Sequence, residues 1–253
     1  MKKISYKKIN NFIAKNIVLP FYEKRLKKLQ SISFKMVVKR KNPYLFKAKN
    51  IETAGDLACC ILDAFLSSQE ETIFGDLLEN FAIFICKNIF NGYKAEQGKF
   101  KSVDLIFERD NKIYVVGIKS GPNWGNSDQI NAMKRNFQKA KEILYKKGKR
   151  IIAVNGCMYG KDKQPQKKGR TSDRTSYFKI CGQSFWELIS GDEKLYKKII
   201  QPLGREAKKR DVVFQDLYVK KINELTKDIV QNFYKKNMLD WDKIIDFVSK
   251  TKE

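Results

Sequence analysis

The residue types that this chain offers for chemistry are limited, because its 253 residues include no histidine. That absence excludes histidine-dependent nucleases such as the HNH type, Ser-His-Asp hydrolysis and the common zinc-hydrolase sites. Any reaction must therefore use carboxylates, lysines or hydroxyls. The five cysteines are odd in number and lack CxxC spacing, so we expect buried thiols in a reducing cytoplasm rather than disulfides or a zinc site.

One carboxylate and one lysine occupy positions that strand pairing would bring together. Two β-rich segments, SVDLIFE and KIYVVGIK, would form a hairpin through a two-residue turn at Asp110-Asn111. Opposed residues would then have numbers that sum to 221, so Asp104 faces position 117 and shares one face of the sheet with Lys119. Carboxylate oxygens are ligands that Mg²⁺ prefers, so this patch could hold such an ion.

This patch resembles the motif of the PD-(D/E)XK nucleases. In that superfamily an Asp at the start of one strand and an acid on the next strand hold Mg²⁺, and a lysine two residues later helps to position or deprotonate the attacking water. The resemblance makes Asp104 the metal-binding acid and Lys119 the catalytic lysine. Gly117 departs from the motif, because it occupies the position of the usual second acid.

A longer resemblance extends over most of residues 70–249. The segments VDLIFE, YVVGIKSGPNWGNSDQI, VNGCMYGK, YFKICGQSFWELISGD, IIQPLG and MLDWDKIIDFVS together resemble type II restriction endonucleases of the PmeII kind. Such an enzyme is expected to be a homodimer that hydrolyses both strands of double-stranded DNA at a short palindromic site with Mg²⁺. The alternative is a catalytically inactive, sequence-specific DNA-binding protein on the same fold.

Three explanations account for Gly117. The second acid was lost, which leaves a DNA-binding protein with little or no cleavage. Alternatively, the metal ligand migrated to a neighbouring helix, with Glu79 or Asp128 as the nearest candidates. In the third explanation, this branch of the superfamily holds the ion with Asp104 and a water, without a second acid. Asp128 also suits a simple first-turn position, because an acid there interacts favourably with the helix dipole.

Two connections are candidates for DNA contact. SGPNWGNSDQ holds two glycines and a proline ahead of a helix N-terminus, a geometry suited to phosphate, and its Gln129 could touch the scissile phosphate or orient Lys119. The long basic loop that begins at Lys161 is expected to clamp DNA, and its arginines could read guanine edges. The predicted DNA-binding residues are Ser120, Asn123, Trp124, Asn126, Lys161, Lys163, Lys167, Lys168, Arg170 and Arg174.

The formal net charge of +24 favours a polyanionic partner, above all nucleic acid. Residues 1–50 carry 15 Lys or Arg against one acid, Glu23. Anionic membrane is a weaker alternative, because the basic residues come with no strongly amphipathic lipid-binding face, and RNA is a third possible partner. No run of roughly 18 apolar residues occurs, so we expect a cytoplasmic protein that needs no membrane and no organic cofactor.

The elements that must position these residues show helical and strand patterns in turn. Helices are expected over 52–67, ending at Ser67-Ser68, then over 70–90 and over 127–148 with Ser127 as N-cap; strands are expected in the hairpin and over 150–160 and 176–182. This order predicts an α/β fold of the restriction endonuclease-like, PD-(D/E)XK kind, with a mixed central sheet flanked by helices. We expect one domain over residues 1–253, with a basic helical N-terminal region (about 1–50) and a helical C-terminal region (about 183–253).

Overall fold

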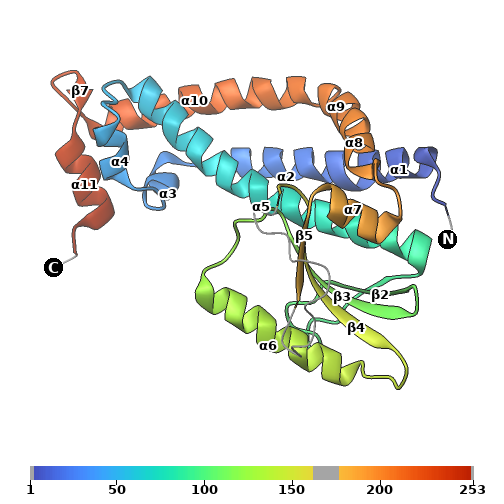
Figure 1. The fold of residues 1–253 in the computed structure, drawn as a ribbon. Coiled ribbons are helices and arrows are strands. Elements are labelled where there is room, and N and C mark those ends of the chain that lie inside the picture. Colours follow the sequence, from blue (N-terminus) through green and yellow to red (C-terminus); the bar gives the residue numbers. More distant parts are fainter. Residues whose placement is uncertain (1–2, 162–176, 252–253) are drawn as a thin grey trace. The chain divides into compact units, whose positions relative to one another are not determined.

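The computed structural model describes residues 3–161 and 177–251. The chain divides into two compact units, one from residues 1–17 and 75–204 and the other from residues 18–74 and 205–253 (Figure 1). Each unit is described by itself below. The single domain expected from the sequence stays a prediction.

The first unit is built on a five-stranded sheet in the order β1-β2-β3-β4-β5. β1, β2 and β3 pair antiparallel, whereas β3, β4 and β5 pair parallel, so the predicted mixed sheet is confirmed. The strands are β1 (Tyr93–Lys94), β2 (Leu105–Arg109), β3 (Lys112–Lys119), β4 (Arg150–Cys157) and β5 (Phe178–Cys181).

The hairpin between β2 and β3 forms in the predicted register. Arg109 pairs with Lys112, so that opposed residue numbers sum to 221 along the ladder. Asp110 and Asn111 have φ angles of 50° and 56°, the two positive values that a type I′ turn requires. The two-residue turn fixes which residues of the two strands oppose each other.

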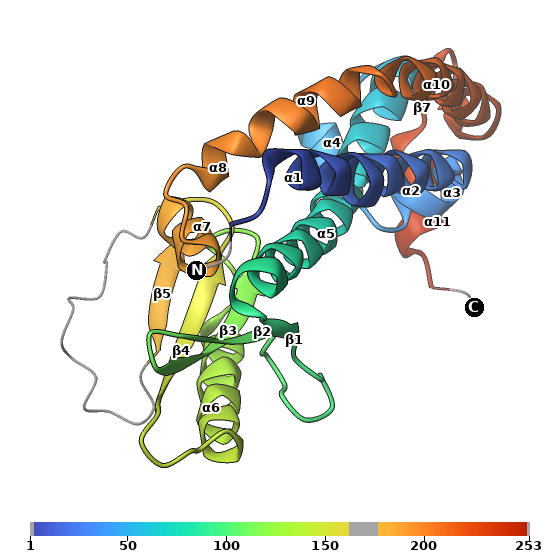
Figure 2. The same cartoon turned by 90° about the vertical axis from the view of Figure 1, so that its right-hand side faces the viewer.

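Helices cover both faces of this sheet (Figure 2). α6 (Ser127–Ile143) packs on one face through a core that includes Val115, Phe137 and Ala153. The last part of α5 (Ala54–Phe90) and α7 (Gln183–Ser190) lie on the other face. There the ring of Phe81 on α5 lies 5.7 Å from that of Trp186 on α7. This unit also contains further helical segments before α5 and after α7. They are α1 (Tyr6–Ile13), nearly all of a π-helical segment (Ala14–Val18), α8 (Leu195–Lys198) and the first part of α9 (Ile200–Lys208).

The second unit is helical apart from one small hairpin. Arg25 holds it together from within, since its guanidinium pairs with Glu70 at 2.6 Å and lies 3.6 Å from the centre of the Phe214 ring. The elements are α2 (Leu19–Gln30), α3 (Phe34–Val38), α4 (Pro43–Ala48), the first part of α5, α10 (Asp211–Phe233), β6 (Tyr234–Lys235), β7 (Met238–Leu239) and α11 (Trp241–Ser249).

Several predicted helix boundaries are wrong, including the end of the helix expected over 127–148, since α6 ends at Ile143. α5 runs from Ala54 to Phe90 without a break at Ser67-Ser68, because both serines are exposed and face solvent while apolar residues on either side continue the packed stripe. α6 begins after Asn126, whose side chain accepts the capping hydrogen bond predicted for Ser127. None of the helices in the described part of the chain has the length and apolar content needed to span a membrane.

Candidate active site

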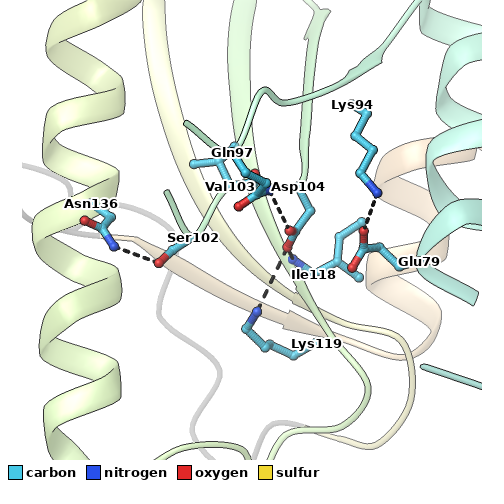
Figure 3. A network of polar contacts seen from close by, with 9 residues as sticks. All are labelled: Glu79, Lys94, Gln97, Ser102, Val103, Asp104, Ile118, Lys119 and Asn136. Carbon is cyan, nitrogen blue, oxygen red and sulfur yellow. Dashed lines mark hydrogen bonds and ion pairs between the residues drawn. The ribbon is translucent and has the colours of Figure 1, made fainter. Parts of the chain in front are cut away.

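Asp104 lies one residue before β2 and contacts β3 with both its backbone and its side chain. Its backbone N–H donates to the Val116 carbonyl at 2.8 Å, and its Oδ2 accepts a hydrogen bond from the Ile118 N–H at 2.7 Å. Figure 3 shows the carboxylate turned toward the end of β3. The side chain is only 13% exposed, so it is held in one orientation at the margin of the sheet.

Lys119 is the last residue of β3 and extends back toward this carboxylate. Its Nζ lies 4.0 Å from Asp104 Oδ2 and 5.2 Å from the centre of the Trp124 ring. An ammonium over an aromatic face is attracted to the ring, so Trp124 and Asp104 both favour this position of the charge. The structure thus brings together the acid and the lysine that the motif assigns to catalysis.

Gln97, in the connection between β1 and β2, also contacts Asp104. Its Nε2 donates to the Val103 carbonyl at 2.8 Å and to Asp104 Oδ1 at 3.4 Å. Both partners are acceptors, which fixes the orientation of the amide group. Sequence reasoning missed Gln97, because neither strand periodicity nor the motif reaches into this connection.

Gly117 lies where the motif has its second acid, and the structure leaves no room there for a side chain. A Cβ at this position would lie 2.6 Å from the backbone carbonyl oxygen of Ser102 and 3.2 Å from the ring of Phe137. A backbone oxygen cannot turn aside as the tip of a flexible side chain can. The glycine therefore lets the chain at Ser102 pass close over β3.

Glu79, on the last part of α5, is the acid that lies toward Asp104. Burial raises the pKa of the Glu79 carboxyl, the charge of Asp104 raises it further, and the Lys94 ammonium acts in the opposite direction. The two acids come from a helix and a strand edge, yet each lies in the field of the other. Asp128, the other candidate, is exposed in the first turn of α6.

A family model described as type II restriction endonuclease EcoO109I matches residues 7–211, which is most of the chain. The chain belongs to the EcoO109I family. Membership confirms the class of type II restriction endonucleases, which are site-specific deoxyribonucleases, and with it a PD-(D/E)XK-like core. The kinship to enzymes of the PmeII kind stays a prediction. A search of curated proteins found no match.

Restriction endonucleases such as the EcoO109I family are typically Mg²⁺-dependent, and the donor set around Asp104 suits that ion. Within residues 3–161 and 177–251, no group of three or more His, Cys, Asp or Glu side chains could hold a metal. Mg²⁺ does not need one, because it keeps several waters, is commonly bound by one or two carboxylates and takes further oxygens from substrate phosphate. Asp104 is one such carboxylate.

The connection that follows Lys119 is tied to its surroundings at two places. Lys179 Nζ donates to the Pro122 carbonyl at 3.0 Å. Asn126 and Gln129 form a capping box, in which each backbone N–H donates to the other side chain at 3.0 Å. These two side chains therefore start α6, a structural role that the sequence-based roles in DNA contact did not include.

The other predicted DNA-binding residues in the described part of this EcoO109I-family chain are placed around the same edge. Trp124 is partly buried against the core under α6, and a pocket of about 380 Å³ beside it is lined by Ser102, Lys119, Trp124, Gln129, Ala132 and Met133. Ser120, Asn123 and Lys161 are exposed. The predictions for Lys163, Lys167, Lys168, Arg170 and Arg174 lie outside the described residues.

Proposed function

We propose that this chain is a Mg²⁺-dependent enzyme that hydrolyses phosphodiester bonds in double-stranded DNA at a short palindromic site, as a cytoplasmic homodimer. The observation that carries the proposal is the Lys119 ammonium 4.0 Å from the Asp104 carboxylate, at the positions where the motif has its metal-binding acid and its lysine. A palindrome presents the same bond on both strands about a two-fold axis, which a symmetric pair of subunits matches.

Each residue has a role that follows from its contacts. Asp104 and Glu79 would hold the ion, which when bound supplies Lewis-acid activation of the phosphodiester and a more acidic water. Lys119 would orient the attacking water and stabilise negative charge that develops on the phosphate. The water oxygen bonds to phosphorus as the bond to the leaving oxygen breaks, and protons are exchanged with solvent. Gln97 would keep the Asp104 carboxylate in place.

The DNA would lie along the edge of the sheet that carries Lys119. Ser120 and Asn123 are exposed directly after the catalytic lysine, so they are placed to contact the backbone next to the cleaved bond. Asn126 and Gln129 would support that contact by fixing the start of α6. The clamp would come from the basic loop, with Lys161, Lys163, Lys167, Lys168, Arg170 and Arg174 as its phosphate and base contacts.

A second candidate function is sequence-specific DNA binding without cleavage. The observation that favours it is the glycine at position 117, where the motif has an acid. In this alternative Asp104 and Lys119 would remain from an ancestral active site, and Glu79 would be a partly buried helix residue whose partner is Lys94.

Plasmid cleavage by the intact chain and three variants separates the two functions. With Mg²⁺, we expect the unmodified chain to cut at defined positions and Asp104→Asn to be inactive. Glu79→Gln should lower the rate roughly 100-fold or more, because loss of an ion ligand removes several kcal/mol of transition-state stabilisation. The matched control is Glu71→Gln, at an exposed acid about two turns earlier on α5, which should cut at the unmodified rate.

The outcomes point to different conclusions. Cleavage that needs Asp104 but not Glu79 would remove Glu79 from the site and leave Asp104 to act with water alone. Tight DNA binding without cleavage by any of the four proteins would support the non-catalytic alternative. Preference for RNA over DNA in the same gels would contradict both.

A further inference from the structure

Lys94 is a second ammonium at the proposed active site, and neither the motif nor the family match assigns it a role. It is the last residue of β1 and pairs with Leu105, so its backbone lies beside that of Asp104. Its Nζ lies 3.3 Å from Glu79 Oε1, as drawn in Figure 3. The Lys94 side chain is 53% exposed, whereas that of Glu79 is 24% exposed.

The two acids and two lysines pair one to one. Lys119 lies 4.0 Å from Asp104, and Lys94 lies 3.3 Å from Glu79. The Lys94 ammonium is therefore paired with the Glu79 carboxylate, which we propose as a ligand of the ion. An ion pair with one half-exposed partner is weak, so Lys94 can leave Glu79 when a stronger cation arrives.

We propose that Lys94 is a phosphate-binding residue, paired with Glu79 in the metal-free protein and released to a DNA phosphodiester when a divalent ion binds Glu79. The inference rests on the proposed function, because it requires Glu79 to be an ion ligand. A divalent ion on the same carboxylate repels an ammonium at this distance. The released side chain is long, flexible and half exposed, and the anion that arrives at this site with substrate is a DNA phosphate.

This exchange couples the divalent ion to DNA. The ion must displace Lys94 from Glu79, so the ion binds the DNA-free protein more weakly than it would without Lys94. The displaced Lys94 ammonium can then bind a phosphate of the DNA backbone. Coupling of this kind is reciprocal, so bound DNA would also favour the ion by keeping Lys94 away from Glu79.

Titration calorimetry with Mg²⁺ alone, without DNA, tests whether Lys94 competes with the ion for Glu79. Lys94→Met should bind Mg²⁺ about threefold or more tightly than the unmodified chain, because a competing charge beside the carboxylate has been removed. The matched control is Lys101→Met. Lys101 is an exposed lysine in the same connection between β1 and β2 and makes no ion pair with any described residue. Its loss removes the same charge and should change Mg²⁺ affinity less.

DNA affinity as a function of salt tests whether the released Lys94 binds DNA phosphate, with mixed-sequence duplexes in either EDTA or Ca²⁺, which also prefers oxygen ligands. The slope of log affinity against log salt is negative, and each lost phosphate contact makes it less steep by about 0.9. For Lys94→Met we expect a larger decrease in Ca²⁺ than in EDTA, because Glu79 competes with the DNA for Lys94 when no ion is bound. For Lys101→Met any decrease should be the same in both buffers.

Each result has one interpretation. Equal Mg²⁺ affinity for Lys94→Met and Lys101→Met, or equal salt slopes for Lys94→Met and the unmodified chain in Ca²⁺, overturns the role of Lys94. Failure of the proposed function is recognised separately, because the unmodified chain would then not cut plasmid DNA with Mg²⁺. Equal Mg²⁺ affinity for the unmodified chain and Glu79→Gln would instead remove Glu79 as an ion ligand.

Discussion

At the scale of single residues, close packing explains why position 117 is a glycine, which the motif does not. Its Cα lies under the carbonyl of Ser102, and the φ of 61° at Ser102 shows that this backbone already adopts a left-handed turn. The missing acid and the tight approach of Ser102 are therefore one feature. A second carboxylate for an ion at Asp104 would therefore have to come from another element, and the residue proposed above is Glu79 on α5.

Substitution of Gly117 should accordingly cost stability and restore nothing. We expect Gly117→Ala to lower the free energy of unfolding by about 1–3 kcal/mol, the usual cost of a side chain forced into a filled space. Gly117→Glu should be at least as destabilised and should not cut DNA faster than the unmodified chain. Urea denaturation and plasmid cleavage measure the two quantities.

Gly98→Ala is the matched control for this prediction. A Cβ at Gly98 would meet nothing within 4 Å, so its stability should be nearly unchanged. Faster cleavage by a stably folded Gly117→Glu protein would show instead that position 117 is the natural place of the acid and that the ligand has not migrated.

At the scale of elements, the start of α6 positions the connection that follows Lys119. Asn126 and Gln129 close the N-terminus of the helix, and Lys179 on β5 fixes the same connection at Pro122. This places a rigid turn between the end of β3 and α6, immediately beside the pocket that Lys119 lines.

Removal of the cap tests whether Asn126 acts in folding or in recognition. Asn126→Ala should lower the free energy of unfolding by about 1 kcal/mol, whereas Asn126→Asp should be nearly neutral because aspartate caps equally well. Chemical denaturation gives these values. Unchanged stability together with weaker binding to DNA would mean that Asn126 contacts the DNA directly, as its sequence context also suggested.

At the scale of the whole molecule, the net charge of +24 should dominate the interaction with nucleic acid. Each phosphate contact releases counterions, so affinity falls steeply as salt rises. If the chain makes about 6–10 phosphate contacts, non-specific DNA affinity should fall by about 10³–10⁵ between 50 and 200 mM salt. Fluorescence anisotropy with a mixed-sequence duplex over this range measures the slope. A slope near zero would show that the basic surface does not face the DNA.

The hairpin of the site could be predicted from the sequence because its determinants are local. Asp110 and Asn111 favour a type I′ turn, and a turn of two residues fixes the register that brings Asp104 toward the end of β3. Lys119 follows from the same counting. The mixed sheet is also implied by the order of the elements, since a helix separates the hairpin from β4.

The rest of the site was decided by tertiary structure, since it depends on contacts between segments far apart in the chain. Glu79 lies on a helix and Gln97 in an irregular connection, both outside the hairpin, so their positions relative to Asp104 depend on how those segments pack against the sheet. The crowding at Gly117 comes from the backbone of Ser102, which no pattern of residue types reports. Local propensity and period set strand register, but the packing of whole elements determined which carboxylate stands beside Asp104.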